Sequence, residues 1–297
     1  MRPIRYVLFL GCLIPTRFPQ FEYLARKTLA QLGIELVDAE GFTCCPDPVR
    51  FGAADRFTWL VLAARNLSIA QRLGLPILTL CPTCTFTLST ANQELQERPM
   101  LAQKVNQVLE EVGHNIHGPV TVKHFLRVIY EDVGLERLRD EVRRPLTELK
   151  IACHSGCHER SPTAILQFDN PFNPVKMEKI LDAMGACVVD YREKSLCCGA
   201  PLTLAGELDD SLAVVKRKVE DMKRYGAEAL SVACAFCFQQ FEIGQVMALR
   251  KRLTDVQLPV FHFLELLALA IGWSLDDIGF KKHKIKKGQE TLASKFR

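Results

Sequence analysis

The chain has 297 residues, of which 48% are hydrophobic and 24% are charged, and its formal net charge is +4. This length allows one large domain or two of ordinary size, and the composition predicts a globular fold with a hydrophobic core. The mild charge gives no reason to expect a nucleic-acid-binding protein, because such proteins carry a concentrated basic face. The twelve cysteines are unusually many for an intracellular chain and need an explanation.

The N-terminus is basic over residues 1–5 and apolar over residues 6–14, around a Gly-Cys step. This resembles a lipoprotein signal, but Pro15 and Arg17 follow with no small-residue cleavage site. A similar strand with a Gly-Cys step recurs at Cys157, in mid-chain, where no signal can operate. We therefore interpret residues 7–10 as a strand and expect a cytoplasmic protein with reduced thiols.

Internal repeats decide the fold prediction. Each half begins with a short apolar strand that ends in Gly-Cys, followed by an amphipathic helix, a strand and two adjacent cysteines. A long helix and another strand then lead to Cys-x-x-Cys. The matching segments are 5–13 with 149–158, 24–46 with 177–199, 60–85 with 212–238, and 122–130 with 260–268.

Helices that alternate with short apolar strands, such as 34–37 and 77–80, are typical of α/β domains with a parallel sheet. We therefore predict an α/β fold of two similar tandem domains, related by internal duplication, each with a small, mostly parallel sheet flanked by helices. The expected domains are 1–146 and 147–280, followed by a basic tail, 281–297. We expect this tail to be solvated and partly disordered, with docking onto an acidic partner as the alternative.

No membrane span is expected. The longest apolar stretch, 258–273, contains His262 and Glu265 and is shorter than the roughly 20 residues that a span needs. A buried amphipathic helix is the better interpretation of this stretch.

The ten cysteines of the repeat all follow predicted strands. Because ligand sites in parallel sheets lie beyond the carboxyl ends of the strands, we expect them on one rim. The first half has the spacing C-x31-CC-x35-C-x2-C, formed by Cys12, Cys44, Cys45, Cys81 and Cys84. The second has C-x39-CC-x35-C-x2-C, formed by Cys157, Cys197, Cys198, Cys234 and Cys237.

Five cysteines exceed the four ligands that zinc or an ordinary four-iron cubane takes. The fifth thiolate indicates a larger or opened iron–sulfur cluster, or one with a bridging thiolate, and makes a structural zinc protein the weaker alternative. Adjacent cysteines in a strand point to opposite faces, so each pair needs a turn to converge, for which Pro46 and Gly199 are suited.

Two cysteines lie outside the repeat, and we expect Cys153 and Cys187 to be small buried hydrophobic residues. Cys153 keeps open the alternative that it is a ligand in place of Cys157. Helix-start or packing roles are expected for His124 and His262, which match between the halves. His154 and His158 flank Cys157 and are candidate catalytic residues that donate hydrogen bonds to sulfur or protons to a leaving thiolate.

The chain has no glycine-rich dinucleotide or phosphate loop, since the segments after Gly11 and Gly199 lack the required glycine spacing. We therefore expect no flavin or nicotinamide on this chain.

The five-cysteine pattern resembles the duplicated cysteine-rich CCG domain and, within it, the family of heterodisulfide reductase B subunits. The likeness covers almost the whole chain. It includes the segments 6–13, 32–39, 44–49, 58–71, 156–159 and 190–201.

This resemblance implies two noncubane [4Fe-4S] clusters, one held by each set of five cysteines. It implies an oxidoreductase that splits a disulfide of coenzyme M and coenzyme B between the clusters, or forms one in reverse. It also implies two partners in the same complex, a ferredoxin-like iron–sulfur protein and, behind it, a flavin-containing protein.

The chain departs from the family at two places. Pro82 and Thr83 stand between Cys81 and Cys84, where small, Gly-containing sequence is usual, and the segment 199–207 lacks the expected glycine run. Both segments are expected to border the substrate cleft. The substrate can therefore be either the coenzyme disulfide or the small or protein-bound sulfur species of a related complex in sulfur-oxidising bacteria, and we keep both alternatives.

The alternative function is a non-catalytic electron relay in a larger dehydrogenase complex, which would need no cleft.

Overall fold

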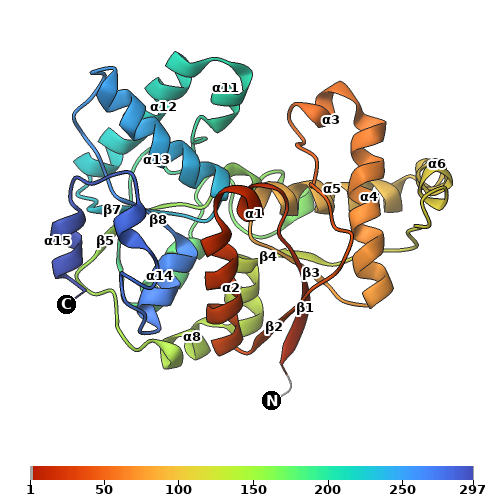
Figure 1. The fold of residues 1–297 in the computed structure, drawn as a ribbon, viewed down its shortest axis with the longest axis horizontal. Helices are drawn as coiled ribbons and strands as arrows, with labels where there is room; N and C mark the ends of the chain where they lie inside the picture. The colour runs from red at the N-terminus through yellow and green to blue at the C-terminus, as the bar shows by residue number, and fades with distance from the viewer. Residues whose placement is uncertain (1–2, 297) are drawn as a thin grey trace.

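The structure, a computed structural model, describes residues 3–296 and contains two four-stranded sheets of the same topology (Figure 1). The first sheet has the order β2-β1-β3-β4 and the second the order β6-β5-β7-β8. All neighbouring strands in both sheets are parallel. The predicted duplicated α/β architecture is therefore confirmed. The predicted domain limits, 1–146 and 147–280, stay predictions.

The first half contains β1 (Ile4–Phe9), α1 (Leu13–Arg17), α2 (Pro19–Gln31), β2 (Ile34–Val37), α3 (Phe51–Ala54), α4 (Arg56–Leu73), β3 (Ile77–Thr79), α5 (Pro82–Glu97), α6 (Pro99–Glu110), β4 (Val122–His124), α7 (Phe125–Arg127), a π-helical turn (Val128–Val133) and α8 (Leu135–Glu141). The second contains β5 (Lys150–His154), a 3-10 turn (Cys157–Glu159), α9 (Thr163–Leu166), α10 (Lys176–Ala183), β6 (Cys187–Val189), α11 (Ala200–Ala205), α12 (Leu208–Arg224), β7 (Ala229–Val232), α13 (Ala235–Arg250), β8 (Val260–His262), α14 (Phe263–Ala270), a 3-10 turn (Phe280–Lys282) and α15 (Gln289–Ser294).

The strands are short, apolar and rich in β-branched residues, as expected for parallel strands covered by helices on both faces. All residues of β7 and β8 are buried, and so are all residues of α14. The stretch 258–273 therefore contains a strand and a helix that is buried on all sides. Within residues 3–296, no helix is both long and apolar enough to cross a membrane.

Aromatic side chains join the two halves in the centre of the molecule. Phe21, on α2, is fully buried and stacks on His262 of the second half, with ring centroids 4.0 Å apart. Its ring also meets Phe238 of α13 edge-on at 5.0 Å. Figure 1 shows α2, in red, beside α14, in blue, so helices from opposite ends of the chain form one core.

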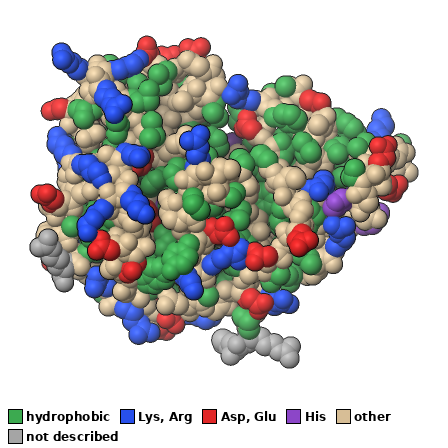
Figure 2. All heavy atoms as spheres, viewed as in Figure 1, with side chains coloured by type: hydrophobic (Ala, Val, Ile, Leu, Met, Phe, Trp, Pro, Cys, Tyr) green, Lys and Arg blue, Asp and Glu red, His purple; other side chains and the backbone are tan. Residues whose placement is uncertain are grey.

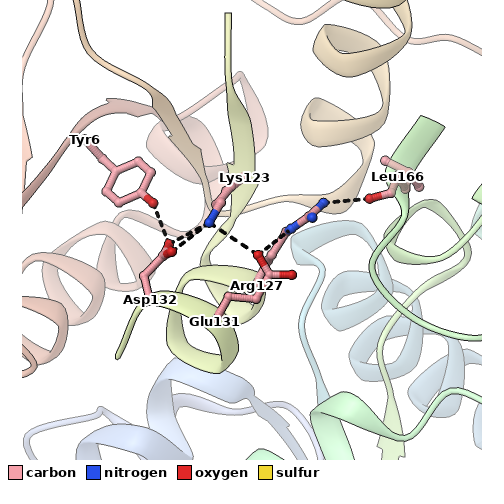
Figure 3. A network of polar contacts seen from close by, with 6 residues as sticks. All are labelled: Tyr6, Lys123, Arg127, Glu131, Asp132 and Leu166. Atoms are coloured by element: carbon pink, nitrogen blue, oxygen red, sulfur yellow. Dashed lines mark hydrogen bonds and ion pairs between the residues drawn. The ribbon is translucent and has the colours of Figure 1, made fainter. Parts of the chain in front are cut away.

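A polar network surrounds the π-helical turn (Figure 3). Asp132 accepts hydrogen bonds from the Tyr6 hydroxyl, at 2.5 Å, and from the Lys123 ammonium, at 2.7 Å. Burial and the adjacent Asp132 carboxylate raise the pKa of Tyr6, so its hydroxyl stays protonated and donates. Arg127 donates to the Leu166 carbonyl of the second half at 2.7 Å, so this network also ties the two halves together.

The C-terminal segment packs three side chains of residues 283–292 against the second half, while the lysines of residues 281–287 are exposed, as expected for a solvated tail. His283 is 7% exposed and Ile285 and Leu292 are buried. The His283 ring lies 2.9 Å from the Val260 carbonyl and 2.9 Å from a Glu265 carboxylate oxygen. Charge patterning alone did not reveal that these few side chains find buried partners.

We expect Phe21→Ala to lower the free energy of unfolding by about 3 kcal/mol or more, because it leaves a cavity between the halves. Denaturant unfolding followed by circular dichroism under anaerobic conditions measures this change. Phe172→Ala is the matched control, since Phe172 is 87% exposed and should cost less than about 0.5 kcal/mol. Equal losses in the two variants would contradict the role of Phe21.

Candidate metal centre

The repeat cysteines lie beyond the carboxyl ends of the strands, as predicted. In each sheet the first strand lies between the second and the third, so the chain leaves its carboxyl end in opposite directions. A crevice is expected where connections diverge in this way. Cys12 follows β1 and Cys81 follows β3 in the first sheet, and Cys157 and Cys234 follow β5 and β7 in the second.

The five cysteines of the first half form what we call the first thiol set. Its thiols are linked by hydrogen-bonding contacts between neighbours. The contacts run from Cys12 to Cys44, from Cys44 to Cys45, from Cys45 to Cys84, and from Cys84 to Cys81.

The five cysteines of the second half form the second thiol set, with the equivalent contacts. These run from Cys157 to Cys197, from Cys197 to Cys198, from Cys198 to Cys237 and from Cys237 to Cys234, and the Cys198 and Cys237 sulfurs are 3.4 Å apart. Cys81 and Cys234 also contact each other. The ten sulfurs therefore form one continuous chain of contacts. The chain is symmetric about the contact between Cys81 and Cys234, with equivalent cysteines of the two halves at equal distances along it from that contact.

The sulfurs come together because the backbone approaches them closely at two glycines. Gly11 has φ +67° and a Cβ there would lie 2.8 Å from the Cys84 sulfur. Gly199 has φ +88°, and its N–H donates to the Cys197 sulfur at 3.5 Å. Only glycine adopts such left-handed conformations at little cost. The turn predicted at Gly199 is thus present in the structure.

Helix starts also contribute to the centre. Cys81 and Cys234 are the residues that precede the long helices α5 and α13, as predicted from Cys-x-x-Cys. Hydrogen bonds from Cys234, Cys84 and the backbone of α5 lower the pKa of Cys81. A helix N-terminus stabilises an anionic sulfur in this way.

The thiol pKa values move in opposite directions along the chain of contacts. Hydrogen bonds from Cys157 and Cys198 lower the pKa of Cys197 to about 2, whereas the contact with Cys197 raises the pKa of Cys198 to about 12. Neighbouring sulfurs therefore cannot all ionise together without a cation between them. Metal binding supplies such a cation, and thiolates are the usual ligands of iron–sulfur clusters.

The two predicted catalytic histidines both lie at the second set. His154 is 2% exposed, and one of its ring nitrogens and the sulfurs of Cys198 and Cys237 all lie within 4.8 Å of one another. Burial holds the pKa of His154 well below its usual value. His158 stacks on Phe86 at 4.7 Å, and its Nδ1 lies 3.1 Å from the Thr83 hydroxyl of the first half.

His124 and His262 occupy N-cap positions of α7 and α14. The ring of His262 accepts a hydrogen bond from the backbone N–H of Leu264 and forms a capping box with Glu265. His124 Nδ1 lies 2.9 Å from a carboxylate oxygen of Glu159, and both residues are buried. Glu159 belongs to the second half and was not singled out by the sequence, because no local pattern marks a contact between halves.

The two cysteines outside the repeat differ from each other. Cys153 is buried, as expected, and burial raises its pKa. Cys157 contacts Cys197, which favours Cys157 over Cys153 as a member of the second set. Cys187 is exposed, so its expected burial is wrong: it is the first residue of β6, the edge strand of its sheet.

A cavity that is open to solvent lies over the second set. Of the ten repeat cysteines, Cys157, Cys197, Cys198, Cys234 and Cys237 line it, and none of the first set does. Its remaining wall comes from both halves and includes Asp47, Val49, Arg50, Pro82, Thr83, His158, Leu204 and Phe236. Figure 2 shows a hollow between the two lobes at the top of the view, with hydrophobic side chains on both sides.

Sequence reasoning placed the segment 199–207, which includes Leu204, at the cleft but missed Val49, Arg50 and Phe236 as wall residues. Each lies within a few residues of a cysteine of the repeat. That proximity was the available signal, but it could not tell which neighbours face a cavity.

Comparisons with known proteins agree with the duplicated cysteine pattern. The CCG family model, described as a cysteine-rich domain, matches residues 6–89 and 151–242. The chain is 35% identical to the B subunit of ferredoxin:CoB-CoM heterodisulfide reductase of Methanosarcina mazei, over 94% of this chain and 93% of the relative. It is 29% identical to the 8-methylmenaquinol:fumarate reductase membrane anchor subunit of Wolinella succinogenes, over 94% of this chain and 96% of the relative.

Among solved structures, a hypothetical protein from Helicobacter pylori has a similar fold, with a TM-score of 0.74 and 16% identity. The match covers 95% of this chain and 52% of that one, so the chain spans about half the length of this structural neighbour.

We expect Cys198→Ala to remove metal from the second set, and hence about half of the iron and acid-labile sulfide of the anaerobically purified chain. Cys187→Ala is the control and should keep the full content, because Cys187 lies outside both sets. Iron and sulfide analysis measures both variants. Loss of iron from Cys187→Ala would show that the ligands are assigned wrongly.

Proposed function

Since the chain belongs to the family of heterodisulfide reductase B subunits, with its duplicated CCG cysteine-rich domain, we propose that it is the iron–sulfur catalytic subunit of a heterodisulfide-reductase-like complex. It reduces, or in reverse forms, a disulfide-type sulfur substrate. Reduction takes two electrons and two protons and yields two thiols.

Each thiol set holds one iron–sulfur cluster, of the noncubane [4Fe-4S] type. Cys12, Cys44, Cys45, Cys81 and Cys84 bind the first, and Cys157, Cys197, Cys198, Cys234 and Cys237 the second. When bound, such clusters accept and donate single electrons, so a two-electron reaction uses two of them. The contacts that join neighbouring thiols within each set support this ligand assignment.

The observation that carries the catalytic role is the cavity over the second set. An electron relay needs no opening beside its metal ligands, whereas a small substrate must reach them through one. The wall is mostly apolar, so water is displaced when a substrate enters, and the polar groups Asp47, Arg50 and His158 are left to orient it.

The histidines divide into two positions relative to the cavity. His158 is part of the wall, so it can hydrogen-bond to a bound thiol or disulfide. Burial lowers the pKa of His158, which keeps its ring neutral at neutral pH. The Thr83 hydroxyl is hydrogen-bonded to its Nδ1. His154 is not part of the wall and lies beside Cys198 and Cys237, where it supports the ligand sulfurs. Both roles are proposals.

The two segments that depart from the family pattern both border the cavity. Pro82 and Thr83 lie on one side, and Ala200, Pro201 and Leu204 on the other. This position supports a substrate that differs from the coenzyme M–coenzyme B disulfide, such as another small or protein-bound disulfide or thiol. The proposed partners are a ferredoxin-like iron–sulfur subunit and a flavin subunit, which supply electrons that this chain then delivers.

The alternative is a non-catalytic electron relay in a larger complex. One observation favours it: the Wolinella relative is named as a subunit of a fumarate reductase, so similar chains serve other oxidoreductases.

Electron paramagnetic resonance of the anaerobically purified, iron-loaded protein tests the catalytic role. We expect at least one candidate thiol or disulfide to induce a new signal, because substrate sulfur reaches the second set through the cavity. The control is the same titration with alcohol analogues of the thiols. A spectrum that no candidate changes would contradict catalysis and support the relay.

Filling the cavity separates the two functions further. We expect Leu204→Trp to lower kcat/KM for the sulfur substrate about tenfold or more, because the larger ring occupies the space that the substrate needs. Reduction of the clusters by a small chemical donor should stay unchanged. Leu249→Trp is the control, since Leu249 is similarly exposed but lies outside the cavity. Equal activity of the two variants would contradict the cavity as the substrate site.

A further inference from the structure

A basic segment lies on the surface of the second half, outside the repeat. Residues 281–287 contain five lysines and no acidic residue. We call Lys281, Lys282, Lys284, Lys286 and Lys287 the basic strip, and all five are exposed. Figure 2 shows basic side chains gathered over the second half, on the left of the view.

The backbone of this segment is held in one conformation. Exposed lysines alternate with the buried side chains of His283 and Ile285. The backbone N–H of Lys284 donates to a carboxylate oxygen of Glu242, at 2.6 Å, and the His283 ring contacts Glu265. Glu242 and Glu265 are both buried. The lysines therefore project from an ordered scaffold, and a partner would lose little entropy in ordering them.

The strip lies close to the second thiol set. Cys237 and Phe238 are consecutive residues of α13, and the Phe238 ring meets the His283 ring edge-on at 5.5 Å. This contact packs α13, the helix that carries Cys237, against the segment that bears the strip. A protein bound to the strip would thus dock next to α13, and none of the strip lysines lines the cavity.

The charges of the strip are largely uncompensated within residues 3–296. Lys281 pairs with Asp276 at 2.8 Å, while Lys282, Lys284, Lys286 and Lys287 form no ion pair there. Four such charges on one ordered segment attract an acidic surface and accelerate its docking.

An acidic protein fits this surface better than a membrane or a nucleic acid. Membrane-surface segments add apolar side chains that enter the lipid, whereas Phe280 and Ile285 point into the protein. Single-stranded nucleic acids are bound with aromatic platforms, and the strip offers none at its surface.

We propose that the basic strip is the docking site for an acidic electron-transfer protein that exchanges single electrons with the second thiol set. One electron leaves the donor and one enters this chain at each encounter, and no covalent bond changes. The inference rests on the proposed function only in requiring that the second set holds iron.

The triple variant Lys282→Glu, Lys284→Glu and Lys286→Glu tests the proposal in the iron-loaded chain. The probe is a purified acidic ferredoxin with two [4Fe-4S] clusters. We expect its dissociation constant, measured by surface plasmon resonance at low salt, to rise about tenfold or more. For the unchanged chain, binding should weaken as salt is added, because salt screens the charges.

The matched control changes three exposed lysines elsewhere: Lys27→Glu, Lys104→Glu and Lys179→Glu. It alters net charge by the same amount and should change the dissociation constant less than about twofold. The rate at which reduced ferredoxin reduces the chain, followed by stopped flow, should fall in the strip variant only.

Three results would overturn the proposal. The first is equal weakening in the strip and control variants, and the second is no weakening in the strip variant. The third is strip-dependent binding to phosphatidylserine vesicles or duplex DNA without binding to ferredoxin.

Failure of the proposed function looks different. Reduced methyl viologen supplies electrons without docking, so disulfide turnover with it should be the same in the strip variant and the unchanged chain. Absence of that turnover, with strip-dependent ferredoxin binding intact, would reject the sulfur chemistry and leave the docking site standing.

Discussion

Ten sulfur atoms in one chain of contacts form the constraint on which the rest of the structure depends. Cys45, Cys81, Cys84, Cys198, Cys234 and Cys237 are all buried. Thiolates in such surroundings are costly unless a cation neutralises them. The tight backbone at Gly11 and Gly199, the cysteines at the starts of α5 and α13, and the contact between Cys81 and Cys234 all serve to bring the sulfurs together.

The same constraint explains why the halves interlock instead of forming two independent units. The chain of contacts passes from one half to the other only at Cys81 and Cys234, so the centre is complete only when both halves are in register. Two contacts between the halves fix that register: Phe21 stacks on His262, and His124 contacts Glu159. Because these groups are buried, a shift of one half against the other would expose aromatic surface and separate a carboxylate from its partner.

The sequence predicts those features of the fold and the site that are determined by residues close together in the chain. Strands, helix starts and the cysteine turns follow from patterns within about 40 residues, and each pattern occurs twice because the second half repeats the first. The exposure of Cys187 depends on β6 being an edge strand, which only the assembled sheet determines. Burial of the tail depends on Glu242 and Glu265, some 20 to 40 positions away in the chain, and the contact of His124 with Glu159 depends on docking of the halves. The hydrophobic periodicity of the sequence gives no information on such contacts between distant residues.

The duplication has also lost its symmetry in a way that separates two roles. The second set alone lines the cavity, and the second half alone carries the basic strip near α13. Under the functions proposed here, an electron donor and a sulfur substrate would approach the second set from different sides, so neither would block the other. The first set, reached through Cys81 and Cys234, would then serve as the second one-electron store that a two-electron reaction needs. The asymmetry thus separates substrate contact, at the second set, from storage of the second electron, at the first.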